Sequence, residues 1–263
     1  MTSTDALFAG SIPALYHDLL GPLLFEPYAW DLAGRTAALQ PARILETAAG
    51  TGIVTGALMR EASQAEIVAT DLNQAMLDVA AKRLVSWRVQ FQQADAQALP
   101  FADSSFDAVV CQFGAMFFPD RVAAFAEARR VLKPGGRLLF NVWDRIERNP
   151  VTAAVAGAVA ALFPDDPPGF FERVPFGYHD TARIEADLRA AGFADIAAET
   201  VEKTSLVAAR DAATGLCQGT PLRAEIEARA PAGLQAATDA AAAALVRFDG
   251  SEAPMSAHVF SAG

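Results

Sequence analysis

Short runs of apolar, β-branched residues alternate with helical periodicity through the middle of the chain. The apolar runs have the length and composition of buried strands, and they occupy residues 42–48, 66–71, 88–95, 106–113 and 136–143. The segments 55–62, 73–84 and 121–132 place their apolar residues at helical spacing instead, and a Lys-Pro-Gly-Gly stop follows the last of them. Strands separated by helices of this length predict a parallel α/β sheet with right-handed crossovers.

The pattern changes after Asp144. Residues 145–178 are helical and then rich in proline and glycine. Asp180 is a good N-cap for a helix that follows it, and Gly192 suits the position after that helix. The rest of the chain predicts a strand at 193–208, an alanine-rich helical region at 210–247 and a short strand at 255–262. These elements add two strands to the sheet, with inserted helices on one side.

The chemistry of the chain begins at the turn after the first strand, in the sequence ILETAAGTG at residues 44–52. A glycine-rich turn that enters a helix offers backbone N–H groups to a nucleotide, and its glycines allow close approach of the ligand. The dinucleotide fingerprint requires G-x-G-x-x-G, whereas Gly50, Gly52 and Gly56 give G-x-G-x-x-x-G. Glu46, two residues before the turn, would repel a pyrophosphate. The turn therefore favours a cationic ligand.

Two further acids end the next two strands. Asp71 follows Glu46 by 25 residues, and a carboxylate there accepts hydrogen bonds from ribose hydroxyls and disfavours the 2′-phosphate of NADP. Asp95 ends the third strand, where it can accept from an exocyclic amine while the N–H of Ala96 meets an adenine ring nitrogen. Because the carboxyl ends of parallel strands share one edge, we expect the three acids to face one crevice.

Composition and charge exclude several other classes of protein. The chain has 263 residues, of which 52% are hydrophobic, and a net charge of −10. That charge disfavours nucleic-acid partners and anionic membrane surfaces. Two isolated cysteines make neither a disulfide framework nor a metal pair, and no cluster of residues suggests a metal site. Without a signal-peptide pattern at the N-terminus, we expect a cytoplasmic protein, and a homodimer stays open as its assembly.

Four segments together resemble the class I S-adenosylmethionine-dependent methyltransferases. They are ILETAAGTG, IVATDLNQAML, QADAQALPFADSSFDAVVCQFGAMFF and EARRVLKPGGRLLF, which span roughly residues 43–143. The general sequence pattern is similar to that of the quinone C-methyltransferases, mainly in the cofactor-binding half. It implies a doubly wound, Rossmann-like sheet of seven strands in the order 3-2-1-4-5-7-6, with strand 7 antiparallel. We expect one domain, residues 1–263, divided into an N-terminal helical lid (1–40), a cofactor-binding core (41–144) and lid helices (145–180 and 208–248).

The resemblance also implies S-adenosylmethionine as cofactor, S-adenosylhomocysteine as product and a set of binding residues. The turn holds the methionine part, Asp71 the ribose, and Asp95 the adenine edge. The family usually has glycine where this chain has Ala48, and a methyl group there is acceptable if φ is negative. The residues predicted to bind the cofactor are Tyr16, Tyr28, Glu46, Ala48, Gly50, Gly52, Asp71, Leu72, Met76, Asp95, Ala96, Gln112, Phe113 and Gly114.

Two aromatic segments are candidate lids: residues 16–33, which the resemblance implies as a lid over the cofactor, and residues 170–179. An aromatic loop of this kind suits an apolar substrate or a closing lid. The residues predicted to contact the acceptor are Phe117, Phe118, Phe171, Phe176 and Tyr178. A base is needed only if the acceptor must lose a proton, and the candidates are His17 and His179.

The predicted activity is methyl transfer to a small-molecule O, N or C acceptor by in-line displacement, driven mainly by orientation and desolvation. One alternative is an NAD-dependent oxidoreductase, but none of Tyr16, Tyr28 or Tyr178 has a lysine four residues later. The other alternative is a non-catalytic protein that binds S-adenosylmethionine, and the cofactor residues serve it equally well.

Overall fold

One mixed seven-stranded sheet organises the molecule. The computed structural model describes residues 8, 10–230 and 232–263. The strands are β1 (Arg43–Glu46), β2 (Glu66–Asp71), β3 (Val89–Gln93), β4 (Phe106–Gln112), β5 (Leu132–Trp143), β6 (Ile196–Leu206) and β7 (Glu252–Ala262). Their order is β3-β2-β1-β4-β5-β7-β6, and β7 runs antiparallel to both of its neighbours. The predicted fold class and strand order are confirmed.

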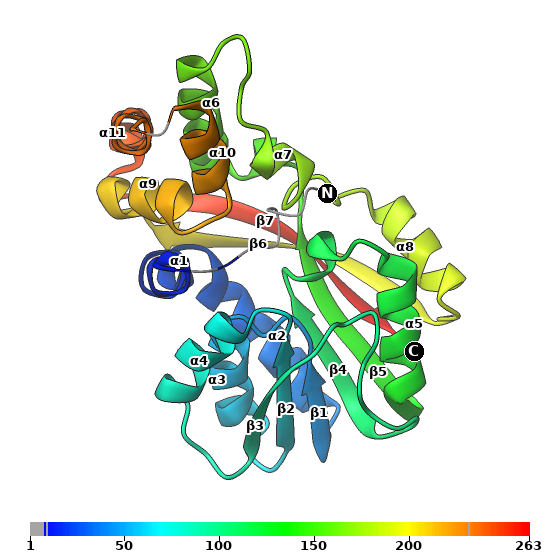
Figure 1. Ribbon diagram of the computed structural model, residues 1–263. Coiled ribbons are helices and arrows are strands. Elements are labelled where there is room, and N and C mark those ends of the chain that lie inside the picture. Colours follow the sequence, from blue (N-terminus) through cyan, green and yellow to red (C-terminus); the bar gives the residue numbers. More distant parts are fainter. Residues whose placement is uncertain (1–7, 9, 231) are drawn as a thin grey trace.

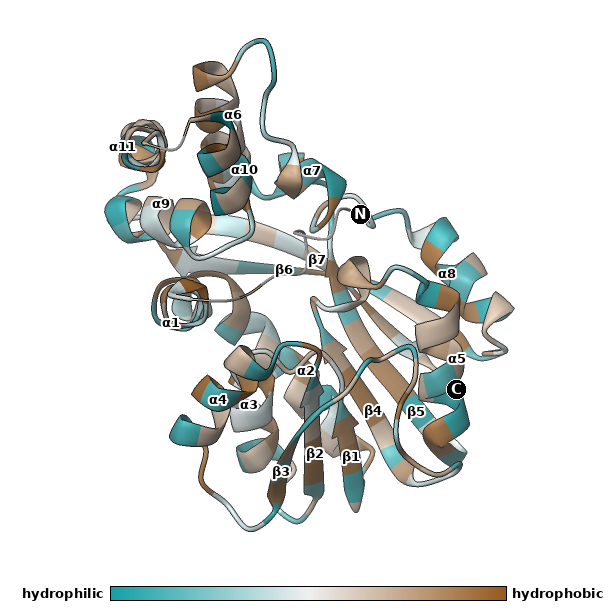
Figure 2. Ribbon diagram, in the orientation of Figure 1, coloured by the Kyte–Doolittle hydropathy of each residue, from teal (hydrophilic) through white to brown (hydrophobic). Residues whose placement is uncertain are grey.

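Helices cover both faces of the sheet (Figure 1). On one face lie α2 (Glu26–Ala38), α3 (Ile53–Glu61) and α4 (Gln74–Arg83), and on the other lie α5 (Arg121–Val131) and α8 (Thr181–Ala190). The central strands are buried almost throughout, because helices cover them on both sides. In Figure 2 the strands β4 and β5 are mainly brown, whereas helices such as α5 and α8 combine teal and brown residues.

A second group of helices caps the extended ends of β6 and β7 (Figure 1). It consists of α6 (Pro150–Leu162), α7 (Phe170–Arg173), α9 (Ala209–Gln218), α10 (Leu222–Arg229) and α11 (Leu234–Leu245). The N-terminal α1 (Ile12–Leu15) and the π-helical η1 (Tyr16–Phe25) pack against α9. Short 3₁₀ turns lie at η2 (Ala115–Phe117), η3 (Ile146–Arg148) and η4 (Val246–Phe248). Residues of this second group of helices, which we call the cap helices, belong to the same apolar core as Ile44 of β1; examples are Val155 and Leu216.

Several local predictions can be compared directly with the structure. Asp180 caps α8 by accepting from the N–H groups of Ala182 and Arg183, and Gly192 follows α8 with a φ of +96°, as expected. By contrast, the predicted turn before the fifth strand lies inside β5, which already begins at Leu132. The extra residues form a bulge, since the pairing with β4 shifts register there.

Two negative findings apply to the part of the chain that the structure describes. None of its helices is both long and apolar enough to cross a membrane. Within the same residues, no group of three or more His, Cys, Asp or Glu side chains could hold a metal ion.

Candidate cofactor and acceptor site

The glycine-rich turn joins β1 to α3 through three residues with left-handed backbone. Ala48 has a φ of +52°, Gly50 of +57° and Gly52 of +81°. The two glycines adopt this conformation without strain, whereas an alanine is disfavoured there. The expectation that Ala48 would need a negative φ was therefore wrong. The turn accepts the alanine in a strained backbone conformation.

Gly114, which lies just after β4, provides the space for the Ala48 methyl group. A methyl group built on Gly114 would lie 2.4 Å from Ala48 Cβ and 2.8 Å from Cys111 Sγ. Real side-chain carbons do not approach one another so closely, so only glycine fits at position 114. The alanine at position 48, where the family usually has glycine, thus requires a glycine at position 114.

The carboxylate of Asp71 lies at the end of β2, directly beside the turn. Its Oδ2 accepts from Gly50 N at 2.8 Å, and its Oδ1 accepts from Asn73 N at 2.8 Å. Burial raises the pKa of Asp71, although these hydrogen bonds act to lower it. Asp71 is only 7% exposed, and it lines a cavity at the carboxyl ends of the strands, which we call the central cavity. Backbone hydrogen bonds therefore fix the carboxylate in one orientation.

Glu46 lies deeper than the cavity wall. It is 2% exposed, and its Oε2 accepts from Thr55 Oγ1 at 2.6 Å. Burial is the main reason why its pKa rises to about 8, and the charge of Asp71 raises it further. Glu46 lines a small pocket of about 30 Å³ beside the turn, together with Gln112 and Tyr16. A buried, protonated carboxyl group there can gain a charge when a cation enters.

The central cavity measures about 270 Å³ and lies along the carboxyl ends of β1 to β4. Every residue predicted to bind the cofactor lines it except Glu46, Gly52 and Tyr28. Its lining also includes the acceptor candidates Phe117 and Phe118. The structure therefore gathers the predicted adenine, ribose and methionine residues around one space.

Two residues of the predicted cofactor set face elsewhere. Tyr28 is fully buried in α2, donates from its hydroxyl to the Val201 carbonyl at 3.3 Å, and packs edge-on against Phe113 and Trp143. Gly52 caps α3, and its Cα faces Leu84 and Ala80 of the neighbouring helix. We therefore remove Tyr28 from the residues proposed to contact the cofactor, and we assign Gly52 only a backbone role.

A second cavity, of about 60 Å³, adjoins the first. The two share Phe8, Tyr16, Phe113 and Phe117. The predicted acceptor residues Phe171 and Phe176 line this smaller cavity, and its remaining walls come from η1, β5 and the cap helices. Tyr178 does not line it: its ring is buried against Arg121, and its hydroxyl donates to Asp187 at 2.7 Å. We refer to the smaller space as the acceptor cavity.

Neither histidine proposed as a base lines the central or the acceptor cavity. His17 Nδ1 lies 2.9 Å from Thr51 Oγ1, and burial is the main reason why the pKa of His17 is lowered. His179 Nδ1 donates to the Phe176 carbonyl at 2.7 Å, and its ring lines a separate cleft. The third histidine, His258, is bound between Thr200 and Asp144.

Several residues that line the two cavities were not predicted from the sequence, and three of them are informative. Asn73 follows Asp71 and lines the central cavity, Trp143 ends β5 and lines the acceptor cavity, and Phe8 lines both. The rule that ligands bind at the carboxyl ends of strands would have found Trp143, because β5 is parallel to β4. Phe8 gave no such signal, because it lies in the predicted N-terminal lid but before its aromatic segment, residues 16–33.

Comparison with known proteins identifies the class of the chain. Residues 45–140 match a family described as "Methyltransferase domain". The demethylmenaquinone methyltransferase of Deinococcus radiodurans is 37% identical over 61% of this chain and 66% of its own length. The enzyme of the same name from Clavibacter sepedonicus is 36% identical over 64% of this chain and 72% of its own length.

Among solved structures, Haemonchus contortus phosphoethanolamine N-methyltransferase 2 in complex with S-adenosyl-L-methionine has a similar fold. The TM-score is 0.61 at 18% identity, over 100% of this chain and 60% of that one. At this identity the likeness shows the fold alone.

The chain belongs to the family of class I S-adenosylmethionine-dependent methyltransferases. S-adenosylmethionine is the cofactor of that family, which sets aside the NAD-dependent alternative. The chain spans about half to two thirds of the length of several curated relatives that it matches. Their full activities and substrates therefore enter only as proposals for this protein.

Proposed function

We propose that this protein transfers the methyl group of S-adenosylmethionine to an apolar small molecule that contains an aromatic ring. The observation that carries the proposal is the acceptor cavity, whose walls are almost entirely apolar and rich in aromatic side chains. Because this cavity adjoins the central one across Phe113 and Phe117, a bound ring would lie beside the cofactor. Apolar walls select an apolar acceptor and exclude water from the reacting groups.

The central cavity supports a matching role for each residue around it. Asp71 would accept from the ribose hydroxyls, while Leu72 and Met76 contact the adenine, and Asp95 and Ala96 read its edge. The turn at Ala48 and Gly50 would hold the methionine part, with Glu46 facing its ammonium group. Gln112, Phe113 and Gly114 then border the place where the two cavities meet.

Among the described residues that line the acceptor cavity, none carries a carboxylate or an imidazole. Their polar side-chain groups are the hydroxyls of Tyr16, Thr152 and Thr220 and the indole N–H of Trp143. Burial, together with the charge of Asp71, raises the pKa of Tyr16, so this phenol stays neutral and can orient an acceptor but not deprotonate it. The rate would then come from alignment and desolvation of an acceptor that is already nucleophilic.

An electron-rich ring carbon is the first candidate acceptor atom. The Deinococcus relative is named for the methylation of demethylmenaquinone, and the relative from Teredinibacter turnerae is named a C-methyltransferase. In such a reaction the sulfonium–methyl bond breaks as a carbon–carbon bond forms, and the ring carbon's proton would be released to solvent when the cavity opens again. At about 60 Å³ the acceptor cavity holds only a few waters, so the aromatic lids around it must open to admit a ring.

Calorimetry and turnover test the proposal in two steps. S-adenosylmethionine should bind and NAD should not, and Asp71→Ala should weaken binding by roughly tenfold or more, because a charge-assisted hydrogen bond contributes about 1.5–3 kcal/mol. Formation of S-adenosylhomocysteine is then measured with a hydroxynaphthalene, a phenol, an alkylamine and an anionic acceptor. The proposal requires turnover with a ring acceptor. Tight cofactor binding without any turnover would support the non-catalytic alternative instead.

A further inference from the structure

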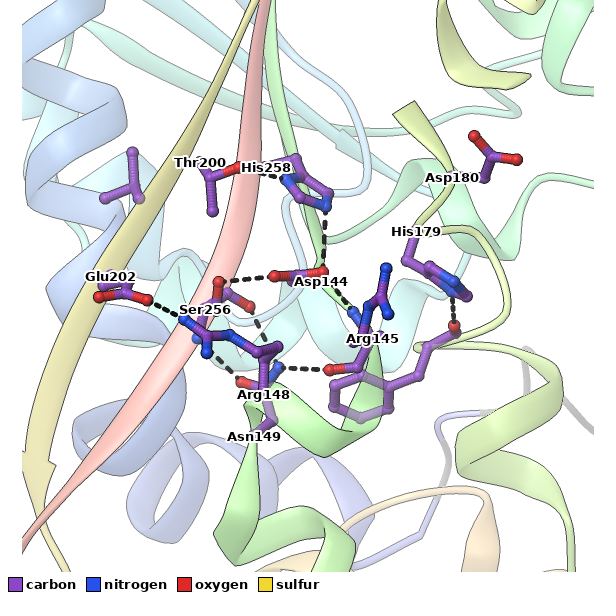
Figure 3. A network of polar contacts seen from close by, with 12 residues as sticks. Asp144, Arg145, Arg148, Asn149, His179, Asp180, Thr200, Glu202, Ser256 and His258 are labelled. Atoms are coloured by element: carbon purple, nitrogen blue, oxygen red, sulfur yellow. Dashed lines mark hydrogen bonds and ion pairs between the residues drawn. The ribbon is translucent and has the colours of Figure 1, made fainter. Parts of the chain in front are cut away.

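A further, open cleft of about 670 Å³ lies apart from the central cavity and the acceptor cavity, and it shares no lining residue with either of them. It is formed where the segment after β5, the beginning of α8 and the strands β6 and β7 meet. Figure 3 labels the lining residues Asp144, Arg145, Arg148, His179, Asp180, Thr200 and His258. The lining side chains that can donate hydrogen bonds into the cleft are Arg145, Arg148, His179, Thr181, Thr200 and His258.

The acids around this cleft already have partners within the protein. Asp144 accepts from Arg145 N at 2.7 Å and from Ser256 Oγ at 2.9 Å, and it pairs with His258 Nε2 at 3.2 Å. Asp180 caps α8, and Glu202 pairs with Arg148. The three carboxylates are therefore hydrogen-bonded or paired within the protein, but Asp180, which accepts only from backbone N–H groups, keeps its negative charge.

Several donors around the cleft, by contrast, make no hydrogen bond to the described residues at their free N–H or O–H groups. The guanidinium of Arg145 makes no hydrogen bond or ion pair with those residues, although its charge acts on Asp144, and in Figure 3 it lies between Asp144 and His179. His179 uses Nδ1 to bind the Phe176 carbonyl, which leaves Nε2 available. Thr181 opens α8, and the positive end of the helix dipole adds to the field there. Donors from three elements thus surround one space.

We propose that this cleft binds a tetrahedral dianion, such as the phosphate group of a small phosphorylated molecule. Arg145 and His179 are its main donors, supported by Thr181 and Arg148. An oxyanion with four oxygens suits donors that approach from several directions, whereas a planar carboxylate suits a single arginine fork. The site is independent of the methyl-transfer site, and the proposal does not rest on the proposed function.

The side chains around the cleft carry no net positive charge. Arg145 and Arg148 balance Asp144 and Asp180, while Glu202 adds a negative charge at the edge. His258 donates from Nε2 to Asp144 and accepts at Nδ1 from Thr200, and burial lowers the pKa of this imidazole. An anion in the cleft would therefore be held by directed hydrogen bonds from Arg145, His179 and Thr181.

Calorimetric titration with sulfate tests the site, because sulfate remains a dianion across the neutral pH range. Arg145→Gln should weaken sulfate binding by about tenfold or more, and His179→Ala should also weaken it, because it removes the donor at Nε2. Arg189→Gln is the matched control: it removes the same charge from an exposed position on α8 outside the cleft, and it should leave binding unchanged.

Two further measurements identify the chemistry of the ligand. Inorganic phosphate and glycerol phosphate should compete with sulfate, whereas chloride at matched ionic strength should not. Tighter binding of glycerol phosphate than of inorganic phosphate assigns the cleft to a phosphorylated organic molecule, and equal binding assigns it to the free ion. The proposal is overturned if sulfate does not bind, if Arg145→Gln and Arg189→Gln behave alike, or if a dicarboxylate binds better than either phosphate.

Discussion

The contact between the glycine-rich turn and the end of β4 predicts a strong and specific effect of Gly114→Ala. The new methyl group would lie 2.4 Å from Ala48 Cβ and 2.8 Å from Cys111 Sγ. Carbons in contact are normally about 3.5–4.0 Å apart, so the first overlap amounts to about 1 Å. Cys111 is buried, and the overlap must be relieved by the backbone. Overpacking costs about 1–3 kcal/mol and occasionally more, and we expect about 3 kcal/mol here.

Ala48→Gly should rescue part of this loss. Alone it relieves the left-handed φ of +52° but adds freedom to the unfolded chain, so we expect a change below about 1 kcal/mol in either direction. In the double variant the 2.4 Å overlap disappears and the 2.8 Å contact with sulfur remains. The two substitutions should therefore couple favourably by about 1–2 kcal/mol.

Urea unfolding of the four proteins measures this cycle directly. The matched control is Gly157→Ala in α6, where the new methyl group meets nothing within 4 Å, so it should be neutral or slightly stabilising. Additivity of the two single changes within about 0.5 kcal/mol would falsify the steric account. A loss with Gly157→Ala as large as with Gly114→Ala would also contradict it.

Three other predictions concern individual side chains. Because the pKa of Glu46 is about 8 in the free protein, a cationic ligand beside it should release about one proton on binding near neutral pH; calorimetry in two buffers measures this, and the release should vanish in Glu46→Gln and well above pH 8. Tyr28→Phe loses the bond to the Val201 carbonyl and should cost about 1 kcal/mol in thermal unfolding, whereas tenfold weaker cofactor binding would return Tyr28 to the site. His17→Ala should keep turnover to S-adenosylhomocysteine within about twofold, since loss of a catalytic base would reduce it about 100-fold or more.

The sequence was sufficient for the sheet because the strands and helices are encoded locally. Apolar runs, the Asp180 cap and Gly192 each depend on a few neighbouring residues, and the family resemblance then supplied the strand order. Asp71 and Asp95 were found because the carboxyl ends of parallel strands meet at one edge. These predictions required no knowledge of how distant segments pack.

The missed features all depend on contacts between distant segments. Ala48 can be left-handed because Gly114, 66 residues further on, provides room for its methyl group. Tyr28 and Tyr178 looked like lid residues, but each hydroxyl finds its partner inside the fold. His179 lies next to a lid loop in sequence, yet its ring turns toward a different cleft. Aromatic and histidine content alone does not show which way a side chain points.

The stacked rings in the acceptor cavity also give the protein an internal optical reporter. Trp143 lies face to face with Phe113 at a centroid distance of 3.9 Å and against Phe176 at 5.9 Å, and it is 4% exposed. The other two tryptophans, Trp30 and Trp87, are 42% and 89% exposed. A soluble quencher such as iodide reaches those two first, so the emission that survives comes mainly from Trp143. Entry of an aromatic acceptor should change this residual signal, which allows acceptors to be screened by fluorescence before any of them is known to react.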